Sequence, residues 1–203
     1  MVEYSTLVEP VKLVAAILYS SESELKAAYS KLEAIFSKID YQGEPFPFEE
    51  SDYYQPEMGE GLFRKMISFD ELVSPGFLAD AKHLTHYIEE ELAEDGFRKI
   101  NIDTGYLDMF KFVLASFKSR SNKIYLGKNI WADMILYFES ATYQPFIWSF
   151  PDFKSGKYNK DLIAIRNRFK QQLKTWLINE KVEDKKYYIW CGRCFNWLEP
   201  PVS

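Results

Sequence analysis

The stretch RKINIDTGYLDMFKFVLASFKS, residues 98–119, decides the fold of this chain. Its first part, Arg98 to Thr104, alternates apolar and polar side chains, which is typical of a strand with one buried face. A second apolar run, Phe112 to Phe117, follows after a connection shorter than the dozen or more residues that a parallel crossover needs. The two runs therefore predict neighbouring antiparallel strands.

The residues that follow extend this pattern. Lys123–Leu126 and Ile130–Phe138 are further apolar runs with short connections, so we expect a meander in which consecutive strands are neighbours. After a proline-containing loop, apolar residues at helical spacing predict a last helix over about 159–179.

Five elements precede the stretch, and apolar periodicity together with capping and turn residues indicates them. They are a buried strand, Val11–Tyr19; a helix, Glu22–Lys38; an edge segment with two prolines, Tyr41–Glu50; a strand, Leu62–Phe69; and a helix that ends at Asp95-Gly96. With the strand at Arg98 they follow the ferredoxin-like βαββαβ order.

We therefore predict an α+β fold: a largely antiparallel sheet with helices on one face, beginning as a ferredoxin-like βαββαβ unit and extended by the meander and a last helix. A doubly wound α/β sheet is the alternative, and the short connections argue against it. No linker divides the chain, so residues 1–180 are predicted to form a single α+β domain, with 181–203 as a C-terminal appendage.

Composition restricts the partners. Hydrophobic residues make up 47% of the 203 residues and the net charge is −5, as expected for a folded, soluble protein. Binding to nucleic acid or to an anionic membrane through bulk charge is therefore not expected. The apolar run Leu13–Tyr19 is far shorter than the roughly 20 residues of a membrane span, and nothing at the N-terminus is typical of a signal peptide. We expect a cytoplasmic location; the oligomeric state stays open.

The familiar chemical signatures are absent. There is no GxxxxGK[ST] phosphate loop, no GxGxxG and no GxSxG elbow, and no cofactor is indicated. His83 and His86 lie three residues apart on a predicted helix, which we interpret as a solvated face. Cys191 and Cys194 form a lone CxxC without the second pair that a structural zinc site usually needs. We predict no metal site and little bound zinc, although the cysteine pair leaves that question open.

The last helix is unusual in its charge. Between 154 and 174 seven basic residues accompany one acidic residue, so this segment carries seven minus one, or +6. Such a helix suits a phosphate backbone or an acidic partner, but it is more often a solvated face opposite an apolar stripe.

Several long strings carry a family resemblance. They are YYQPEMG (53–59), LFRKMISFDELVSPGFL (62–78), the stretch at 98–119, KIYLGKNIWADMIL (123–136) and WSFPDF (148–153). In this order they resemble the bacterial and archaeal domain-of-unknown-function 4416 family over about 11–166. That family implies no activity that transfers to this chain. It implies shared polar positions at Asp52, Tyr54, Glu57, Arg64, Lys82, Asn101, Asp103, Gly105, Tyr106, Lys111, Ser116, Lys118, Tyr125, Trp148 and Asp152.

The chain departs from the family pattern at Ser116–Ser119, at Asn122–Leu126 and at Trp148–Phe153, where several hydroxyls, a histidine and a carboxylate are replaced. Chemistry that those groups perform in relatives is therefore in doubt here.

The residues themselves point to the same region. Asp103 lies on the strand face opposite Ile100 and Ile102, and Ser116 and Lys118 share one face of the next strand. Lys82 and Glu89 are expected away from the apolar stripe of their helix. Our candidate ligand-binding residues are Asp52, Glu57, Asp103, Lys111, Ser116, Lys118 and Tyr125.

Two hypotheses follow. The first is a protein that binds a small phosphorylated or anionic ligand, nucleotides among them, with the loop from Asp52 to Glu57 as a lid and with catalysis left open. A variant of it places a hard cation on Asp103 and a loop carboxylate. Against both stands a buried salt-bridge network that only fixes strand register. The second hypothesis is a non-catalytic module whose aromatic strands and basic last helix dock a protein or RNA.

Overall fold

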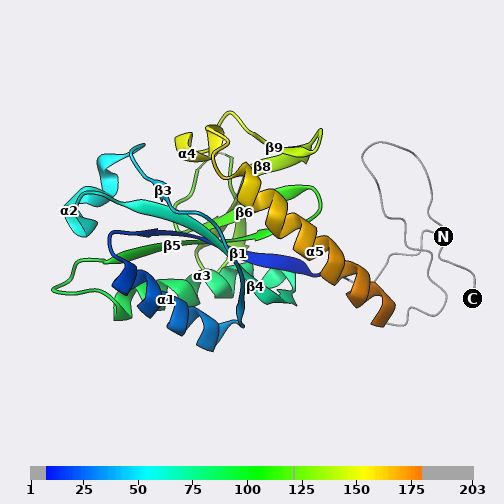
Figure 1. Ribbon diagram of the computed structural model, residues 1–203, viewed down its shortest axis with the longest axis horizontal. Helices are drawn as coiled ribbons and strands as arrows, with labels where there is room; N and C mark the ends of the chain where they lie inside the picture. Colours follow the sequence, from blue (N-terminus) through cyan, green and yellow to red (C-terminus); the bar gives the residue numbers. More distant parts are fainter. Residues whose placement is uncertain (1–7, 121, 180–203) are drawn as a thin grey trace, which may run out of the picture.

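A computed structural model describes residues 8–120 and 122–179 of the chain, and nine strands in this part form one sheet. Every strand pair is antiparallel, and the main order is β2-β4-β1-β5-β6-β8-β7, with β3 beside β4 and β9 beside β8 (Figure 1). The strands are β1 (Val11–Tyr19), β2 (Ile39–Gln42), β3 (Phe46–Pro47), β4 (Phe63–Val73), β5 (Ile100–Leu107), β6 (Lys111–Ser116), β7 (Ile124–Gly127), β8 (Ile130–Glu139) and β9 (Thr142–Pro145).

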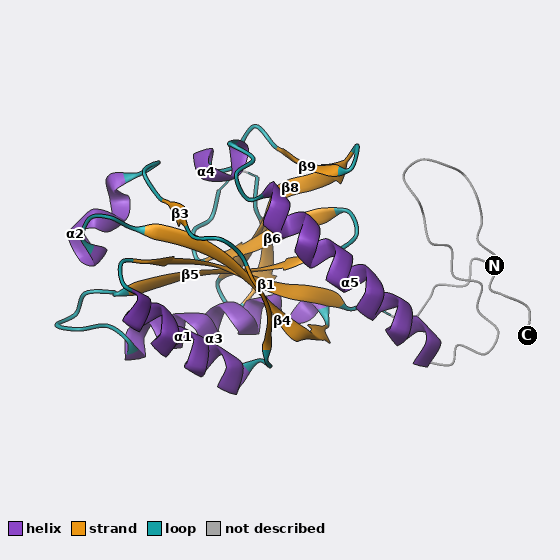
Figure 2. Ribbon diagram, in the orientation of Figure 1, coloured by secondary structure: helices purple, strands orange, loops and turns teal. Residues whose placement is uncertain are grey.

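The helices of the described part occupy both sides of the sheet (Figure 2). They are α1 (Glu22–Ile35), α2 (Gln55–Met58), α3 (Leu78–Glu91), α4 (Pro151–Lys154) and α5 (Asn159–Asn179), with single 3-10 turns η1 (Asp52–Tyr54) and η2 (Pro75–Phe77).

The predicted α+β class and its antiparallel sheet are confirmed. The βαββαβ unit consists of β1, α1, β2, β4, α3 and β5, and its four strands lie side by side as β2-β4-β1-β5. The last helix spans the predicted residues, because its apolar stripe repeats without interruption from Leu162 to Leu173. The first helix ends at Ile35, three residues earlier than predicted.

The expectation that helices cover one face is wrong. Leu13, Ala15 and Ile17 of β1 pack with α1 and α3, whereas Val14 and Ala16 pack on the opposite face with α5. Strand β1 is buried at all nine positions. A continuous apolar strand is typical of a sheet that is covered on both faces, and its two alternating sets of side chains require the second layer.

The predicted meander is also only partly correct. β6 pairs with β8, and β7 lies outside β8 at the sheet edge. The physical reason is burial: β8 brings Ile130 and Ile135 into the core, whereas Ile124 of the short β7 remains 72% exposed. The strand with the fewest buried side chains, β7, therefore lies at the edge of the sheet. Strand β9 was not predicted, because it ends at Pro145 and its residues were interpreted as a loop.

The structure does not test the predictions on the cysteine pair, the C-terminal appendage and the cellular location. The CxxC of Cys191 and Cys194 and the proposed appendage at 181–203 lie outside the described residues. Among the helices that are described, none is long and apolar enough to cross a membrane. The cytoplasmic location stays a prediction.

Candidate functional site

The neighbouring strands β5 and β6 part in the middle of the sheet. Their last paired residues are Gly105 and Leu114. Beyond this point Asp103 stays in register with Ala16 of β1, while Ser116 at the end of β6 pairs with Trp131 of β8. A β-carbon on Gly105 would fall well inside contact distance of the Val113 carbonyl oxygen, so the two strands lie very close together at this last pair.

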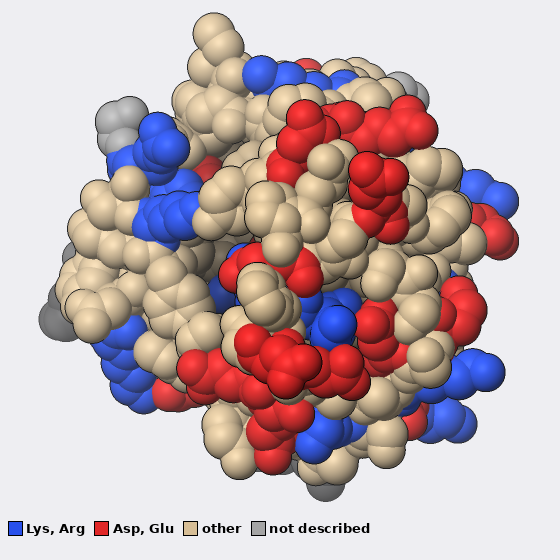
Figure 3. Space-filling view, turned by 90° about the vertical axis from the view of Figure 1, so that its left-hand side faces the viewer, with Lys and Arg blue, Asp and Glu red and all other residues tan. Residues whose placement is uncertain are grey.

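Polar side chains gather where the strands part. We call this region the polar opening; it comprises Asp103, Ser116, Lys118, Arg98 and the 51–61 segment that contains η1 and α2. Figure 3 shows this end of the molecule, with Lys and Arg side chains in a hollow near the middle of the face and Asp and Glu side chains around it.

Arg64 is the buried anchor beside the polar opening. It points from β4 to the α5 side of the sheet and is 3% exposed. Its Nη1 donates to Asp152 Oδ2 at 2.5 Å, and its Nη2 donates to Asp103 Oδ2 at 3.1 Å. The Phe48 ring centroid lies 4.6 Å from its guanidinium carbon. Burial works against the charge, but Asp103 and Asp152 outweigh it and raise the pKa of Arg64. The guanidinium therefore ties β5 and α4 to β4.

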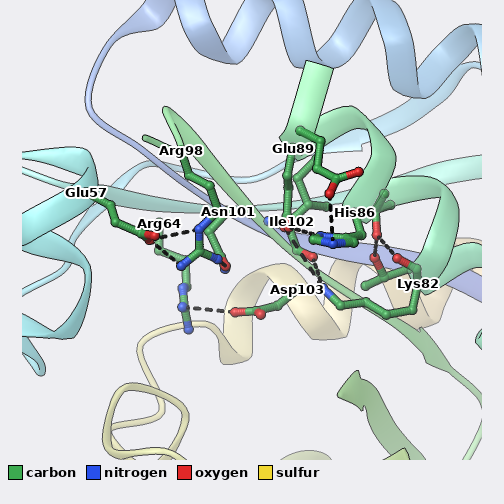
Figure 4. Close-up of polar contacts among 12 residues, drawn as sticks. Glu57, Arg64, Lys82, His86, Glu89, Arg98, Asn101, Ile102 and Asp103 are labelled. Carbon is green, nitrogen blue, oxygen red and sulfur yellow. Dashed lines mark hydrogen bonds and ion pairs between the residues drawn. The ribbon is translucent and has the colours of Figure 1, made fainter. Parts of the chain in front are cut away.

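A second arginine faces the 51–61 segment (Figure 4). Arg98 donates from Nε to Glu57 Oε2 at 2.8 Å, and its Nη2 donates to the same oxygen. Its Nη1 donates to Asn101 Oδ1 at 3.1 Å. Burial lowers the pKa of Arg98, yet Glu57 outweighs this effect and the net shift is upward. Both partners stay partly exposed, at 27% for the Arg98 side chain and 37% for that of Glu57.

The 51–61 segment closes over the end of the sheet through apolar contacts. Met58 is buried and packs in a small cluster with Leu18 and Leu62, which Tyr54 joins. Burial, and then the nearby Asp103 carboxylate, raise the pKa of Tyr54. The segment therefore brings its own polar residues to the polar opening.

One contact of the segment reaches the β6 side of the polar opening. Lys118 Nζ donates to the Tyr53 hydroxyl at 3.2 Å and lies 4.5 Å from the centroid of the same ring. Ser116 Oγ accepts from the Lys118 backbone N–H at 3.0 Å, which fixes the turn that carries the lysine.

The opposite face of the parting strands is covered by α3. Glu89 Oε1 accepts from the Ile102 N–H at 2.5 Å, and Lys82 Nζ donates to the Ile102 carbonyl at 2.8 Å (Figure 4). Thr85 and Thr104 share a hydroxyl hydrogen bond of 2.5 Å. The expectation that Lys82 and Glu89 lie away from the apolar stripe is wrong, because they are 6% and 2% exposed. They are buried since β5 has lost β6 as a partner there, and buried backbone groups must find other partners.

The structure brings five of the candidate residues to this end of the molecule. Asp103, Ser116 and Lys118 border the parting of β5 and β6, and Asp52 and Glu57 lie on the segment above it. Asp52 accepts from Gln55 Nε2 at 2.9 Å within that segment.

Two candidate residues lie elsewhere. Lys111 pairs with Asp108 at the other end of β6, roughly 17 Å from Ser116 at the usual rise per residue. Tyr125 lies on the edge strand β7, where its ring packs 4.9 Å from that of Trp131.

Sequence reasoning left several residues of this region out of the candidate set, among them Tyr53, Arg64, Arg98, Asn101 and Asp152. Arg64 and Asp152 are 88 residues apart, so no local pattern joins them. The family resemblance marks Arg64, Asn101 and Asp152 as shared polar positions, and this signal was sufficient to select them.

Histidines and carboxylates do not gather into a metal site in the part of the chain described here. No group of three or more His, Cys, Asp or Glu residues there is placed to hold an ion. His86 Nδ1 lies 3.4 Å from Glu89 Oε2, and His83 Nε2 lies 2.8 Å from the Lys128 carbonyl oxygen.

The family model described as "Domain of unknown function (DUF4416)" matches residues 9–169, more than three quarters of the chain. The chain belongs to this family. The DUF4416 match contains every residue of the polar opening, from the 51–61 segment to Lys118. No curated protein and no solved structure matches the chain.

Proposed function

We propose that this protein binds a small phosphorylated or otherwise anionic molecule at the polar opening. The observation that supports this most is the position of two accessible cations, Arg98 and Lys118. They come from different segments of the chain, and each contacts the same 51–61 segment, through Glu57 and Tyr53.

The donors at the opening suit an anion. Lys118 supplies a mobile point charge, and Arg98 supplies a planar edge that matches the oxygens of a phosphoryl group. The Tyr53 hydroxyl, which accepts from Lys118 Nζ, adds a neutral donor beside it. Asp103, whose side chain is 26% exposed, offers an acceptor for a hydroxyl group of the ligand.

The competing explanation, a network that only fixes strand register, accounts for part of the site. The Arg64–Asp152 pair is buried on both sides and has a structural role. The contacts of Arg98 and Lys118 are partly or fully exposed, and such pairs contribute only about 0–1 kcal/mol to stability. These contacts of Arg98 and Lys118 therefore add little to the stability of the fold, which favours a role in binding for both side chains.

A second candidate function, docking of a partner protein, rests on the loop after β9. Phe146 and Trp148 are stacked with their ring centroids 4.7 Å apart, and Ile147 is 87% exposed. The basic helix α5 supports this candidate less, because Arg166 donates to the Met109 carbonyl and covers the Phe138 ring. The partner that this loop fits is then a second copy of the chain, and size-exclusion chromatography with light scattering, with and without Trp148→Ala, tests that self-association.

A thermal-shift screen of the full chain tests the ligand proposal. The panel holds nucleotides, sugar phosphates and inorganic phosphates, and a ligand at 100 times its Kd adds about 2.7 kcal/mol. We expect Lys118→Gln to lose the shift and Lys128→Gln to keep it, since Lys128 pairs with Asp80 on α3. A panel without any shift, or equal shifts in both variants, would contradict the proposal.

A further inference from the structure

The accessible edge of Arg98 is occupied by a carboxylate of its own chain. Glu57 Oε2 accepts from both Nε and Nη2, which is the edge that a guanidinium offers to a phosphoryl oxygen. Glu57 stands on α2, a single helical turn that reaches β4 through Gly59 and Gly61. Both glycines have positive φ, 79° and 70°, which glycine adopts without the cost other residues incur.

The remaining nitrogen of the same guanidinium, Nη1, contacts a buried side chain that has a donor without an acceptor. Arg98 Nη1 can only donate, so the Asn101 atom that it meets must be Oδ1, and this fixes the orientation of the amide. Asn101 is 5% exposed, and its Nδ2 has no hydrogen-bond partner. Because a buried donor without an acceptor is costly, its presence here is an independent sign that an acceptor belongs in this place.

We propose that Arg98 and Asn101 form a subsite for the phosphoryl group of the ligand, and that Glu57 occupies it while no ligand is bound. The incoming group replaces Glu57 on the Nε and Nη2 edge of Arg98 and supplies an oxygen to Asn101 Nδ2. Release of Glu57 removes the ion pair that ties the 51–61 segment to Arg98 and leaves Met58 packed on Leu18 and Leu62, so binding loosens the segment. This inference rests on the proposed function for the remainder of the ligand, but its central exchange involves only an oxyanion and Glu57.

Inorganic pyrophosphate is the probe, and calorimetric titration of the full chain gives its Kd. Removing the competing carboxylate with Glu57→Gln should tighten binding about fivefold, the equivalent of one partly exposed ion pair. Glu60→Gln is the matched control, because Glu60 lies on the same segment, is exposed and makes no ion pair with another described residue. Adding Arg98→Lys to Glu57→Gln keeps the charge, removes the planar edge and should weaken binding about tenfold.

Hydrogen exchange gives a second measurement on the same proteins. Glu57→Gln should speed exchange of the backbone amides in 51–61 relative to the wild type, and Glu60→Gln should not. Equal affinity of the wild type and Glu57→Gln, absence of pyrophosphate binding by Glu57→Gln, or indifference of that variant to Arg98→Lys would each overturn the subsite.

The experiments distinguish a failure of the Arg98–Asn101 subsite from a failure of the proposed ligand-binding function. A phosphorylated compound that depends on Lys118 and ignores Arg98→Lys leaves the proposed function standing without this subsite. Pyrophosphate binding that depends on Arg98 but not on Lys118, with no nucleotide or sugar phosphate of the screen shifting the wild type, leaves the subsite standing and contradicts the part of the proposed function that assigns Lys118 to the ligand.

Discussion

Arg64 and Asp152, 88 residues apart in the sequence, meet at 2.5 Å inside the protein, where each side chain is less than 5% exposed. This pair fastens α4 to the sheet, and the remaining Nη of Arg64 reaches outward to Asp103. One guanidinium thus has a structural partner on its buried side and a partner at the polar opening on its accessible side. The two carboxylates should differ in what their removal costs.

Asp152→Asn should therefore destabilise the protein by about 3 kcal/mol, because it leaves the buried Arg64 charge without its closest partner. Asp103→Asn should cost about 1 kcal/mol or less, since Asp103 is partly exposed and Arg64 keeps Asp152. Urea unfolding of both variants gives the comparison. Equal costs would mean that Asp103 is as structural as Asp152, which would weaken its assignment to a ligand site.

The parting of β5 from β6 depends on α3. Glu89→Leu removes the acceptor of the Ile102 N–H and the carboxylate nearest Lys82, so we expect a loss of about 3 kcal/mol. Glu89→Gln keeps an acceptor oxygen and should cost only about 1 kcal/mol. Amide exchange at Ile102 should rise in the Leu variant and stay close to wild type in the Gln variant. Unchanged protection in the Leu variant would show that Ile102 does not depend on Glu89.

Gly105 stands at the last contact between the two strands. Alanine there would clash with the Val113 carbonyl and place its β-carbon 2.8 Å from Leu114 Cδ2, so Gly105→Ala should cost about 2–3 kcal/mol. Gly76→Ala is the control, because its nearest neighbour would be 3.7 Å away and its φ is not positive. Chemical denaturation should separate the two variants clearly. A neutral Gly105→Ala would mean that β5 and β6 part without strain.

Local patterns predicted the elements of this fold better than their arrangement. Apolar periodicity predicted the approximate bounds of α5, and the alternation in β5 placed Asp103 on the face opposite Ile102. The same patterns did not show that α5 covers the second face, although the unbroken burial of β1 requires a layer there. Nor did they place β8 inside β7, since both strands have short connections and only their burial differs.

Local patterns likewise predicted some residues of the candidate site and missed those that depend on contacts between distant segments. Asp103, Ser116 and Lys118 were selected from strand alternation and from the family resemblance, and the structure places them at one opening. Lys111 was selected from the family resemblance alone, which marks a shared polar position and does not say at which end of the strand it lies. The contacts of Arg64 join segments far apart in the sequence, so periodicity carries no sign of them.

The free energy of unfolding should fall at alkaline pH, and part of this fall should come from the hydroxyl of Tyr19. Tyr19 is 2% exposed, and its burial, assisted by Glu22, raises the pKa of its hydroxyl from 10.0 to about 12. Between these values the unfolded chain has lost the Tyr19 proton and the folded chain retains it, so the free energy of unfolding falls as the pH rises. Tyr19→Phe removes this contribution, and the pH dependence should become shallower by up to about 1.4 kcal/mol per pH unit. Urea midpoints from pH 9 to 11.5 measure it, and parallel curves for the two proteins would contradict the shift.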